Sequence, residues 1–121
     1  MIVGTGIDMA ELKRIEAVLI RHEAFSQRIL TENELNKYNF LSTKRKIEYL
    51  AGRFAAKEAF SKAKGTGIGK ELSFQDIETG YDSLGKPMIL KPSYPNQKIH
   101  LSISHTKEYA LAQVIIERLS S

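Results

Sequence analysis

Two carboxylates and a lysine stand out as residues whose types and spacing could support chemistry on phosphate. Glu58 and Lys62 lie four residues apart in the run Arg53-Phe-Ala-Ala-Lys-Glu-Ala-Phe-Ser-Lys-Ala-Lys-Gly65, and a helix brings residues with this spacing onto one face. Asp8 follows the short apolar run from Ile2 to Ile7. Two carboxylates leave most positions of an octahedral magnesium ion for water and substrate phosphate oxygens. The pattern therefore predicts magnesium-assisted phosphate chemistry at Asp8 and Glu58.

Each of these residues also has a plainer structural interpretation. Glu58 and Lys62 could form an ordinary helix-surface ion pair, worth about 0.2–0.5 kcal/mol. Both nevertheless fall within the apolar arc that Ala51 and Ala55 define on the same helix, so full exposure to solvent is not expected. Asp8 could cap a following helix, because Asp8 and Glu11 have the spacing of a capping box. The sequence leaves these alternatives open.

A glycine-rich segment and a histidine are weaker candidates. Lys64-Gly-Thr-Gly-Ile-Gly-Lys70 has the composition of a phosphate-binding loop, but it follows a helix and does not join a strand to a helix, which argues against a dinucleotide or P-loop motif. It is either a helix exit or a place where Lys64 and nearby amides approach a phosphate. His105 ends a predicted strand, and the histidines lack the spacing of a zinc site.

The remaining pattern predicts the elements that must position these residues. Apolar positions three and four apart predict a helix directly after Asp8, Thr31 and Glu34 form a capping-box signature for a short helix through about Phe40, and Ser42 can cap a long helix over residues 43–63 that Gly65 ends. From residue 72 the apolar period shifts toward two, and the predicted strands are 73–79, 88–91, 99–105 and 109–117, with the last two forming a hairpin. We therefore expect an α+β fold, with an N-terminal strand and helices and a long central helix packed on a mainly antiparallel sheet.

Composition limits the possible classes. A chain of 121 residues with 42% hydrophobic content can bury one ordinary core, so residues 1–121 are expected to form a single domain. The net charge of +4 attracts acidic partners without choosing among them. The chain has no cysteine, which excludes disulfides and thiolate metal sites and agrees with a cytoplasmic location. Since no apolar run approaches the length of a membrane span, no membrane association is expected.

The motifs taken together are similar to one known family. They are Gly6-Ile-Asp8, Phe54-Ala-Ala-Lys-Glu-Ala-Phe-Ser-Lys-Ala63, Lys64-Gly-Thr-Gly67, Gly85-Lys-Pro87 and Ser102-Ile-Ser-His105. In this order they closely resemble bacterial holo-acyl-carrier-protein synthase, the small class of 4'-phosphopantetheinyl transferases, and the resemblance runs essentially from end to end. Phe54 stands where larger relatives often have tryptophan, a difference that affects packing and leaves the candidate ligands in place.

The resemblance implies a reaction and the residues that perform it. Asp8 and Glu58 would bind magnesium, and the serine hydroxyl of an apo acyl carrier protein would attack the β-phosphate of coenzyme A. Glu58 or a water on the metal would act as base, and Lys62 would neutralise or protonate the departing adenosine 3',5'-bisphosphate. The product, holo acyl carrier protein, supports fatty acid biosynthesis.

The resemblance also implies where coenzyme A and the carrier protein bind. Four residues match positions that hold phosphates of coenzyme A: Lys64, Gly65, His105 and Thr106. The turn with Ser83, Gly85 and Pro87 matches the wall beside the adenine. The family is known as a homotrimer whose sites lie between subunits.

Arg14 and Arg21, seven residues apart on the first helix, would face an acidic helix of the carrier protein, although a simple solvated face explains each arginine equally well. Two other classes remain as alternatives: a small basic nucleic-acid-binding module and a noncatalytic scaffold that binds carrier protein. Neither gives a role to Asp8, Glu58 and Lys62, and the chain lacks the interleaved aromatics of a base-stacking surface. No nucleic-acid partner is therefore expected.

Overall fold

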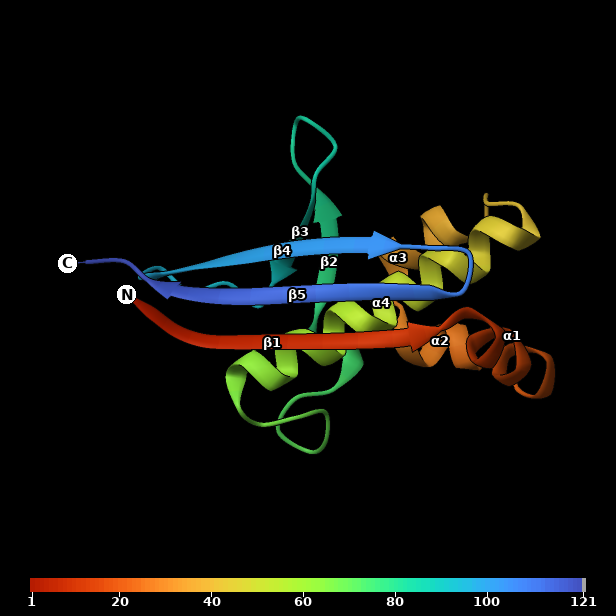
Figure 1. Ribbon diagram of the computed structural model, residues 1–121, viewed down its shortest axis with the longest axis horizontal. Helices are drawn as coiled ribbons and strands as arrows, with labels where there is room; N and C mark the ends of the chain where they lie inside the picture. The colour runs from red at the N-terminus through yellow and green to blue at the C-terminus, as the bar shows by residue number, and fades with distance from the viewer. Residues whose placement is uncertain (121) are drawn as a thin grey trace.

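A computed structural model describes residues 1–120 and confirms the α+β architecture. The elements along the chain are β1 (Ile2–Glu11), α1 (Leu12–Arg21), α2 (Phe25–Ile29), α3 (Glu32–Tyr38), α4 (Thr43–Lys64), the 3-10 turn η1 (Phe74–Asp76), β2 (Glu78–Tyr81), β3 (Pro87–Lys91), β4 (Gln97–His105) and β5 (Tyr109–Arg118). Antiparallel pairing places β5 between β1 and β4, and β2 with β3 forms a separate two-stranded sheet (Figure 1). The predicted hairpin of the last two strands is confirmed.

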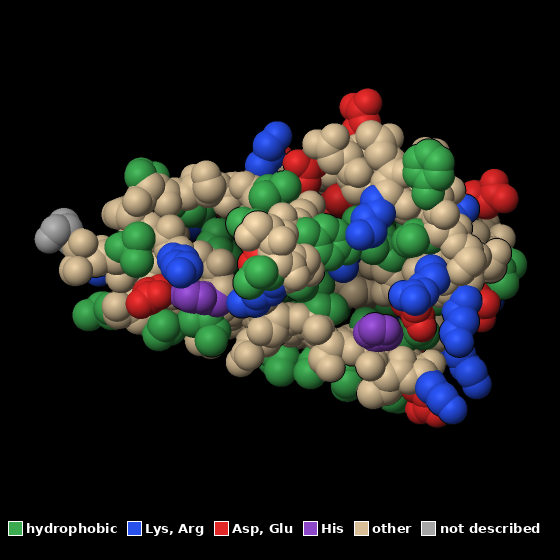
Figure 2. Space-filling view, turned by 90° about the horizontal axis from the view of Figure 1, so that it is seen from above, with side chains coloured by type: hydrophobic (Ala, Val, Ile, Leu, Met, Phe, Trp, Pro, Cys, Tyr) green, Lys and Arg blue, Asp and Glu red, His purple; other side chains and the backbone are tan. Residues whose placement is uncertain are grey.

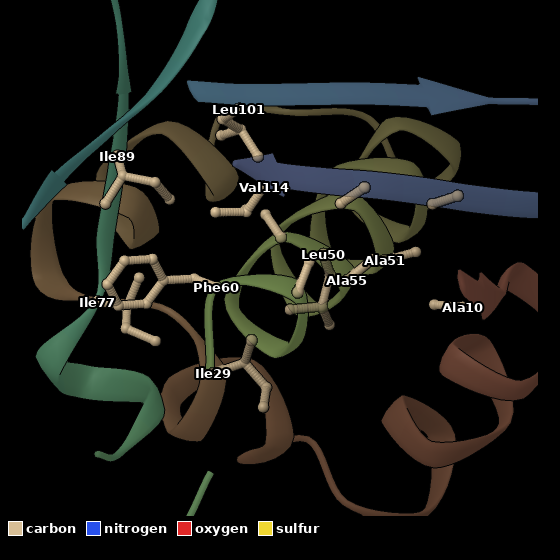
Figure 3. Packing of buried hydrophobic residues seen from close by; sticks show 14 of the residues in the cluster. Ala10, Ile29, Leu50, Ala51, Ala55, Phe60, Ile77, Ile89, Leu101 and Val114 are labelled. Atoms are coloured by element: carbon tan, nitrogen blue, oxygen red, sulfur yellow. The ribbon is translucent and has the colours of Figure 1, made fainter. Parts of the chain in front are cut away.

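The core lies between α4 and one face of the three-stranded sheet. Small side chains on α4 allow close packing, since Ala51, Ala55, Ala56 and Ala59 are completely buried. Larger apolar side chains from other elements, among them Ile29, Leu101 and Val114, fill the space around the helix (Figure 3). The C-terminal half of α4 is therefore packed on more than one side, as its alanines predict.

Local signals set the ends of the helices. The Ser42 hydroxyl accepts a hydrogen bond from the Arg45 amide at the start of α4, and Gly65 ends that helix in the left-handed region, at φ 85°. Thr31 and Glu34 form the expected reciprocal capping box at the start of α3. These three predictions are confirmed.

The predicted end of the first strand at Asp8 was wrong. β1 continues past Asp8, which pairs with Ala112, to Glu11, which pairs with Tyr109 on β5. The N-cap of α1 is Glu11, and no side chain caps this helix, so Asp8 is not a capping residue. A long partner strand supplies backbone hydrogen bonds at positions where the local sequence suggested a helix start.

Two further elements differ from the expectation. The predicted strand 73–79 begins instead as the turn η1, because the Asp76 carboxylate accepts a hydrogen bond from the Ser73 amide, and β2 begins only at Glu78. The five-residue helix α2 was not predicted; the Gln75 side chain holds its C-terminal end by donating to the carbonyls of Gln27 and Leu30. Within residues 1–120, no helix combines the length and the apolar content that crossing a membrane requires.

Candidate active site

Asp8, Glu58 and Lys62 come together where β1 crosses α4. The Lys62 Nζ donates to the Asp8 Oδ1 and to the Ile7 carbonyl, both at 3.0 Å. Asp8 is the less exposed partner, at 17% of its side-chain surface against 51% for Lys62. Glu58 is half-buried one helical turn before Lys62. The two sequence-distant carboxylates and the ammonium therefore form one cluster.

Electrostatics in this cluster favour an added cation. Burial is the main cause that raises the pKa of Glu58, the neighbouring Asp8 carboxylate raises this pKa further, and Lys62 partly offsets both effects by lowering it. The two carboxylates therefore repel each other when both are ionised. A divalent cation between them would relieve that repulsion and favour the ionised form of each.

Glycines in β1 make this approach of strand and helix possible. A Cβ atom at Gly6 would overlap the Ala59 carbonyl oxygen, and one at Gly4 would overlap the Ala63 carbonyl oxygen. The β1 backbone therefore rests directly on α4, and Asp8, two residues beyond Gly6 on the same side of the strand, is carried to the helix face beside Glu58.

The donor set fits magnesium and not an all-protein metal cage. Among residues 1–120, no three His, Cys, Asp or Glu side chains gather as a candidate ligand group. The pair Asp8 and Glu58 would supply two oxygen ligands, and magnesium commonly keeps its remaining positions for water and substrate phosphate. The residues present thus fit a magnesium ion that is completed by a bound phosphate compound.

A second part of the candidate site is a cavity of about 360 Å³ beside the N-terminal half of α4. Its lining brings Pro87, from the predicted adenine-side turn, together with His105, at the end of β4. Arg45 and Arg53 on α4 and Tyr81 on β2 line the same cavity. Arg45, Arg53 and Tyr81 were not predicted from the sequence. The two arginines could have been noticed as basic residues on the side of the long helix away from Glu58.

The other residues predicted to contact coenzyme A lie around and beyond this cavity. Thr106 shares a neighbouring groove with His105. Ser83 and Gly85 are exposed in the β2–β3 turn. In this turn the Asp82 carboxylate accepts hydrogen bonds from two backbone amides, and Gly85 has φ 84°. Lys64 and Gly65 lie at the opposite end of α4.

The Lys64 ammonium lies 4.4 Å from the centre of the Tyr94 ring, a cation–π contact with the loop between β3 and β4. Arg45, in the cavity wall, lies twenty residues before Gly65, so the two are separated by about 30 Å along the helix axis. Within one chain, the structure therefore does not bring Lys64 and Gly65 to the cavity with His105.

Arg14 and Arg21 are both exposed on α1, as expected. Seen from above, Lys and Arg side chains gather at one end of the molecule with acidic side chains among them (Figure 2), and α1 lies at the same end but on the lower side in Figure 1. This surface carries the cations that an acidic partner would need.

Comparison with known proteins decides the family. The model of the 4'-phosphopantetheinyl transferase superfamily matches residues 4–114, which include Asp8, Glu58 and Lys62. The chain belongs to this superfamily. A Bacillus velezensis holo-[acyl-carrier-protein] synthase is 66% identical over 120 residues, which cover 99% of each chain, and a Bacillus subtilis protein of the same name is 61% identical over the full length of both.

Solved structures of the superfamily agree with the fold. A Bacillus anthracis holo-(acyl-carrier-protein) synthase in complex with CoA (3',5'-ADP) superimposes with a TM-score of 0.88 at 55% identity, covering 99% of each chain. The Helicobacter pylori enzyme in complex with coenzyme A gives a TM-score of 0.81 at 36% identity, covering 93% of this chain and 99% of that one. The transferase fold implied by the sequence is confirmed.

Proposed function

We propose that this chain transfers the 4'-phosphopantetheine group from coenzyme A to a serine of apo acyl carrier protein, in support of fatty acid biosynthesis. The products are holo acyl carrier protein and adenosine 3',5'-bisphosphate. The observation that carries this proposal is the cluster of Asp8, Glu58 and Lys62. The chain that forms it belongs to the superfamily, and relatives that match it over almost their whole length are named holo-[acyl-carrier-protein] synthases.

The cluster supplies the groups that the reaction needs. The serine oxygen forms a bond to the β-phosphorus while the bond from that phosphorus to the bridging oxygen breaks, and the bridging oxygen leaves on adenosine 3',5'-bisphosphate. Glu58, or a water on the metal, accepts the serine proton. Lys62 lies beside the carboxylates and neutralises or protonates the leaving phosphate.

Magnesium is the cofactor that fits this proposal. Asp8 and Glu58 would hold the ion, and coenzyme A would complete its ligand set with pyrophosphate oxygens. When bound, magnesium withdraws charge from the reacting phosphoryl group. Without it, the two carboxylates repel an incoming pyrophosphate and Lys62 offsets only part of their charge, so a cation at this position favours the binding of coenzyme A.

We assign the two ends of coenzyme A to two sets of residues, one around the cavity and one at the C-terminal end of α4. His105 and Thr106 receive a phosphate of the adenosine end, and Ser83, Gly85 and Pro87 form a wall beside the adenine. Lys64 and Gly65 contact a phosphate at the end nearer to Lys62. The cavity that joins Pro87 to His105 supports the first assignment, because the basic side chains of Arg45 and Arg53 line it and the turn lies beside it.

The separation of these groups favours sites between subunits. One coenzyme A molecule cannot contact both ends of α4 in a single chain, since about 30 Å of helix separates them. The sheet face turned away from α4 also exposes apolar side chains, including Ile7, Met9 and Leu111. We therefore propose a homotrimer in which each site combines the Asp8 cluster of one subunit with the His105 cavity of its neighbour.

Arg14 and Arg21 are proposed to receive the acyl carrier protein. Both are exposed, and both lie on one face of α1, at the end of the molecule where cations gather. An acidic helix of the carrier protein would be steered to this face and held there by charge complementarity. The cytoplasmic location and the single domain over residues 1–121 also stay predictions, the latter supported by one apolar cluster that runs from Ala10 to Ile116.

Intact-mass spectrometry tests the proposed function. Apo acyl carrier protein is incubated with this protein, coenzyme A and magnesium, with a parallel sample that contains a chelator. We expect the mass of one phosphopantetheine to be added to the carrier protein with magnesium and not with chelator. No mass gain, with folded protein and a carrier that a known synthase modifies, would reject the proposal.

A further inference from the structure

Arg53 is a buried cation without a carboxylate of its own. It is 6% exposed, its Nη2 donates to the Tyr81 hydroxyl at 2.7 Å, and its guanidinium lies 4.3 Å from the centre of the Tyr49 ring. None of the ion pairs found among residues 1–120 includes Arg53. A guanidinium in the wall of a cavity, held by a hydroxyl and an aromatic ring, keeps its charge available for an anion that enters.

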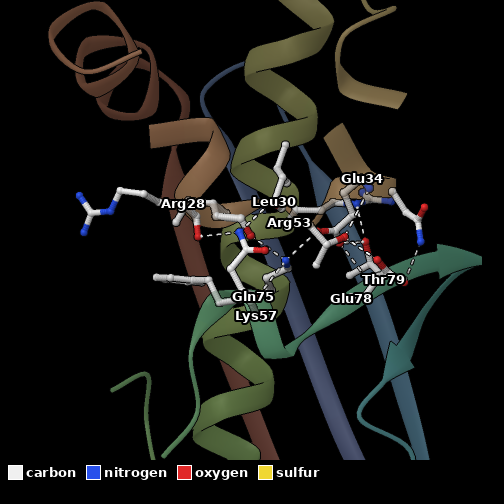
Figure 4. Close-up of polar contacts among 12 residues, drawn as sticks. Arg28, Leu30, Glu34, Arg53, Lys57, Gln75, Glu78 and Thr79 are labelled. Atoms are coloured by element: carbon white, nitrogen blue, oxygen red, sulfur yellow. Dashed lines mark hydrogen bonds and ion pairs between the residues drawn. The ribbon is translucent and has the colours of Figure 1, made fainter. Parts of the chain in front are cut away.

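The Nε of Arg53 is held by Thr79, a residue that does not line the cavity. This Nε donates to the Thr79 Oγ1 at 3.1 Å, and Thr79 is 5% exposed on β2. The Thr79 hydroxyl donates in turn to the Glu34 Oε2 at 2.7 Å. Figure 4 shows this chain of contacts running from α4 through β2 to α3.

The direction of each hydrogen bond follows from the chemistry of the groups. The Nε–H of Arg53 can only donate, so a lone pair of the Thr79 Oγ1 accepts from it and the single hydroxyl proton of Thr79 points to the Glu34 carboxylate. The other contacts of Glu34 also use it only as an acceptor: the Lys57 Nζ lies 2.7 Å from its Oε1, and the backbone amides of Thr31 and Thr79 each donate to it at 2.8 Å. The donor and the acceptor of each hydrogen bond between Lys57 and Arg53 are therefore fixed.

We propose that Thr79 is a positioning residue for the binding of coenzyme A. Its hydroxyl, oriented by Glu34, fixes the plane of the Arg53 guanidinium so that the free N–H groups face the cavity in which a phosphate of coenzyme A binds. Thr79 acts through Arg53 and touches no substrate. This inference rests on the proposed function, which assigns the cavity to coenzyme A.

Removal of the hydroxyl has a defined consequence. In Thr79→Val the side chain keeps its shape, but Nε of Arg53 and Oε2 of Glu34 each lose one partner. The guanidinium can then turn within the cavity wall, and binding of an anion must order it again. Thr79→Ser restores the donor and the acceptor and serves as the matched control.

The test measures binding of adenosine 3',5'-bisphosphate by calorimetry and the kinetics of transfer in parallel. We expect Thr79→Val to weaken binding about fivefold and to raise the KM for coenzyme A by a similar factor, with kcat changed less than about twofold, while Thr79→Ser stays within about twofold of the wild type. In the background of Arg53→Met, Thr79→Val should produce no further weakening, because the residue through which Thr79 acts is gone. Melting curves establish that all variants are folded at the assay temperature.

Distinct results would overturn the inference and the proposed function. Wild-type affinity in Thr79→Val, an equal loss in the Arg53→Met background, or failure of serine to restore binding would each show that Thr79 does not position Arg53. If the wild type binds the bisphosphate but transfers nothing to a competent carrier protein, the proposed function fails, and the binding series still decides whether Thr79 orients Arg53 toward an anion.

Discussion

Two lysines on α4, five residues apart, have different environments. The Lys57 Nζ is completely buried and donates to the Glu34 carboxylate, to the Ile29 carbonyl at 2.6 Å and to the Phe74 carbonyl at 3.1 Å. Burial lowers the pKa of Lys57, and Glu34 partly restores it. Lys62 is half-exposed and pairs with Asp8 at the candidate active site. The first lysine therefore ties elements together, and the second is available for chemistry.

This difference predicts two unequal losses of stability. Lys57→Met leaves the Glu34 carboxylate buried without its cation, and we expect the free energy of unfolding to fall by about 3–5 kcal/mol. Lys62→Met, the matched control, removes an exposed pair and should change stability by less than about 1 kcal/mol. Urea denaturation followed by circular dichroism measures both. Equal losses of unfolding free energy in the two variants would show that the buried Lys57–Glu34 pair does not stabilise the fold more than the Lys62–Asp8 pair does.

The raised pKa of Glu58 predicts how stability depends on pH. The folded state of the metal-free protein binds the Glu58 proton more tightly than the unfolded state does, so the wild type loses stability as pH rises from the ordinary glutamate range through the raised pKa. Glu58→Gln removes this effect and should melt at a higher temperature than the wild type above that range, with little difference below it. Melting curves across pH, in chelator, would contradict the account if the glutamine variant were the less stable one at neutral pH.

At the scale of elements, the contact of β1 with α4 determines whether the site forms. Gly6→Ala would drive a methyl group into the Ala59 carbonyl, and we expect the loss of unfolding free energy to reach about 3 kcal/mol, with strong loss of transfer because Asp8 moves away from Glu58. At Gly69 an added Cβ meets no atom within 4 Å, so Gly69→Ala is the control and should be nearly neutral. Denaturation and transfer assays measure both effects; a stable, active Gly6→Ala would refute the close approach.

Elements marked by a strong local signal could be predicted from the sequence, and those fixed by distant partners could not. The caps at Ser42 and Thr31 and the exit at Gly65 act within a few residues and were correct. The extension of β1 past Asp8 depends on pairing with β5, about one hundred residues later, so the local capping pattern was misleading. The five-residue helix α2 depends on the Gln75 side chain, which no pattern within residues 25–29 indicates.

At the scale of the whole molecule, one part of the candidate site could be predicted from the sequence and another part could not. The spacing of Glu58 and Lys62 and the position of Asp8 were sufficient to predict their cluster. Arg45, Arg53 and the Glu34–Thr79 chain were missed, because their meaning depends on how β2 and α3 pack beside α4. Buried polar networks of this kind are tertiary features and leave no periodic trace in the sequence.

The exposed sheet face predicts the effect of an added charge on assembly. Leu111 lies on β5, the central strand, opposite Met9 on β1, and both are exposed on the side away from α4. Leu111→Glu should convert the proposed trimer to monomer and abolish transfer, while the folded state of each chain is retained. Light scattering coupled to size exclusion measures the mass. A wild-type monomer with full activity would reject assembly through this face.

The measurement that tests the account most directly mixes two inactive variants. Asp8→Ala removes the candidate magnesium ligand, and the pair His105→Ala with Arg45→Ala weakens the cavity; each preparation alone should transfer little phosphopantetheine. After joint unfolding and refolding in equal amounts, about one quarter of sites between subunits would combine an intact cluster with an intact cavity, so we expect activity to return to about that fraction of the wild type. Activity no greater than the sum of the two separate variants would contradict the proposal that each site is shared between neighbouring subunits.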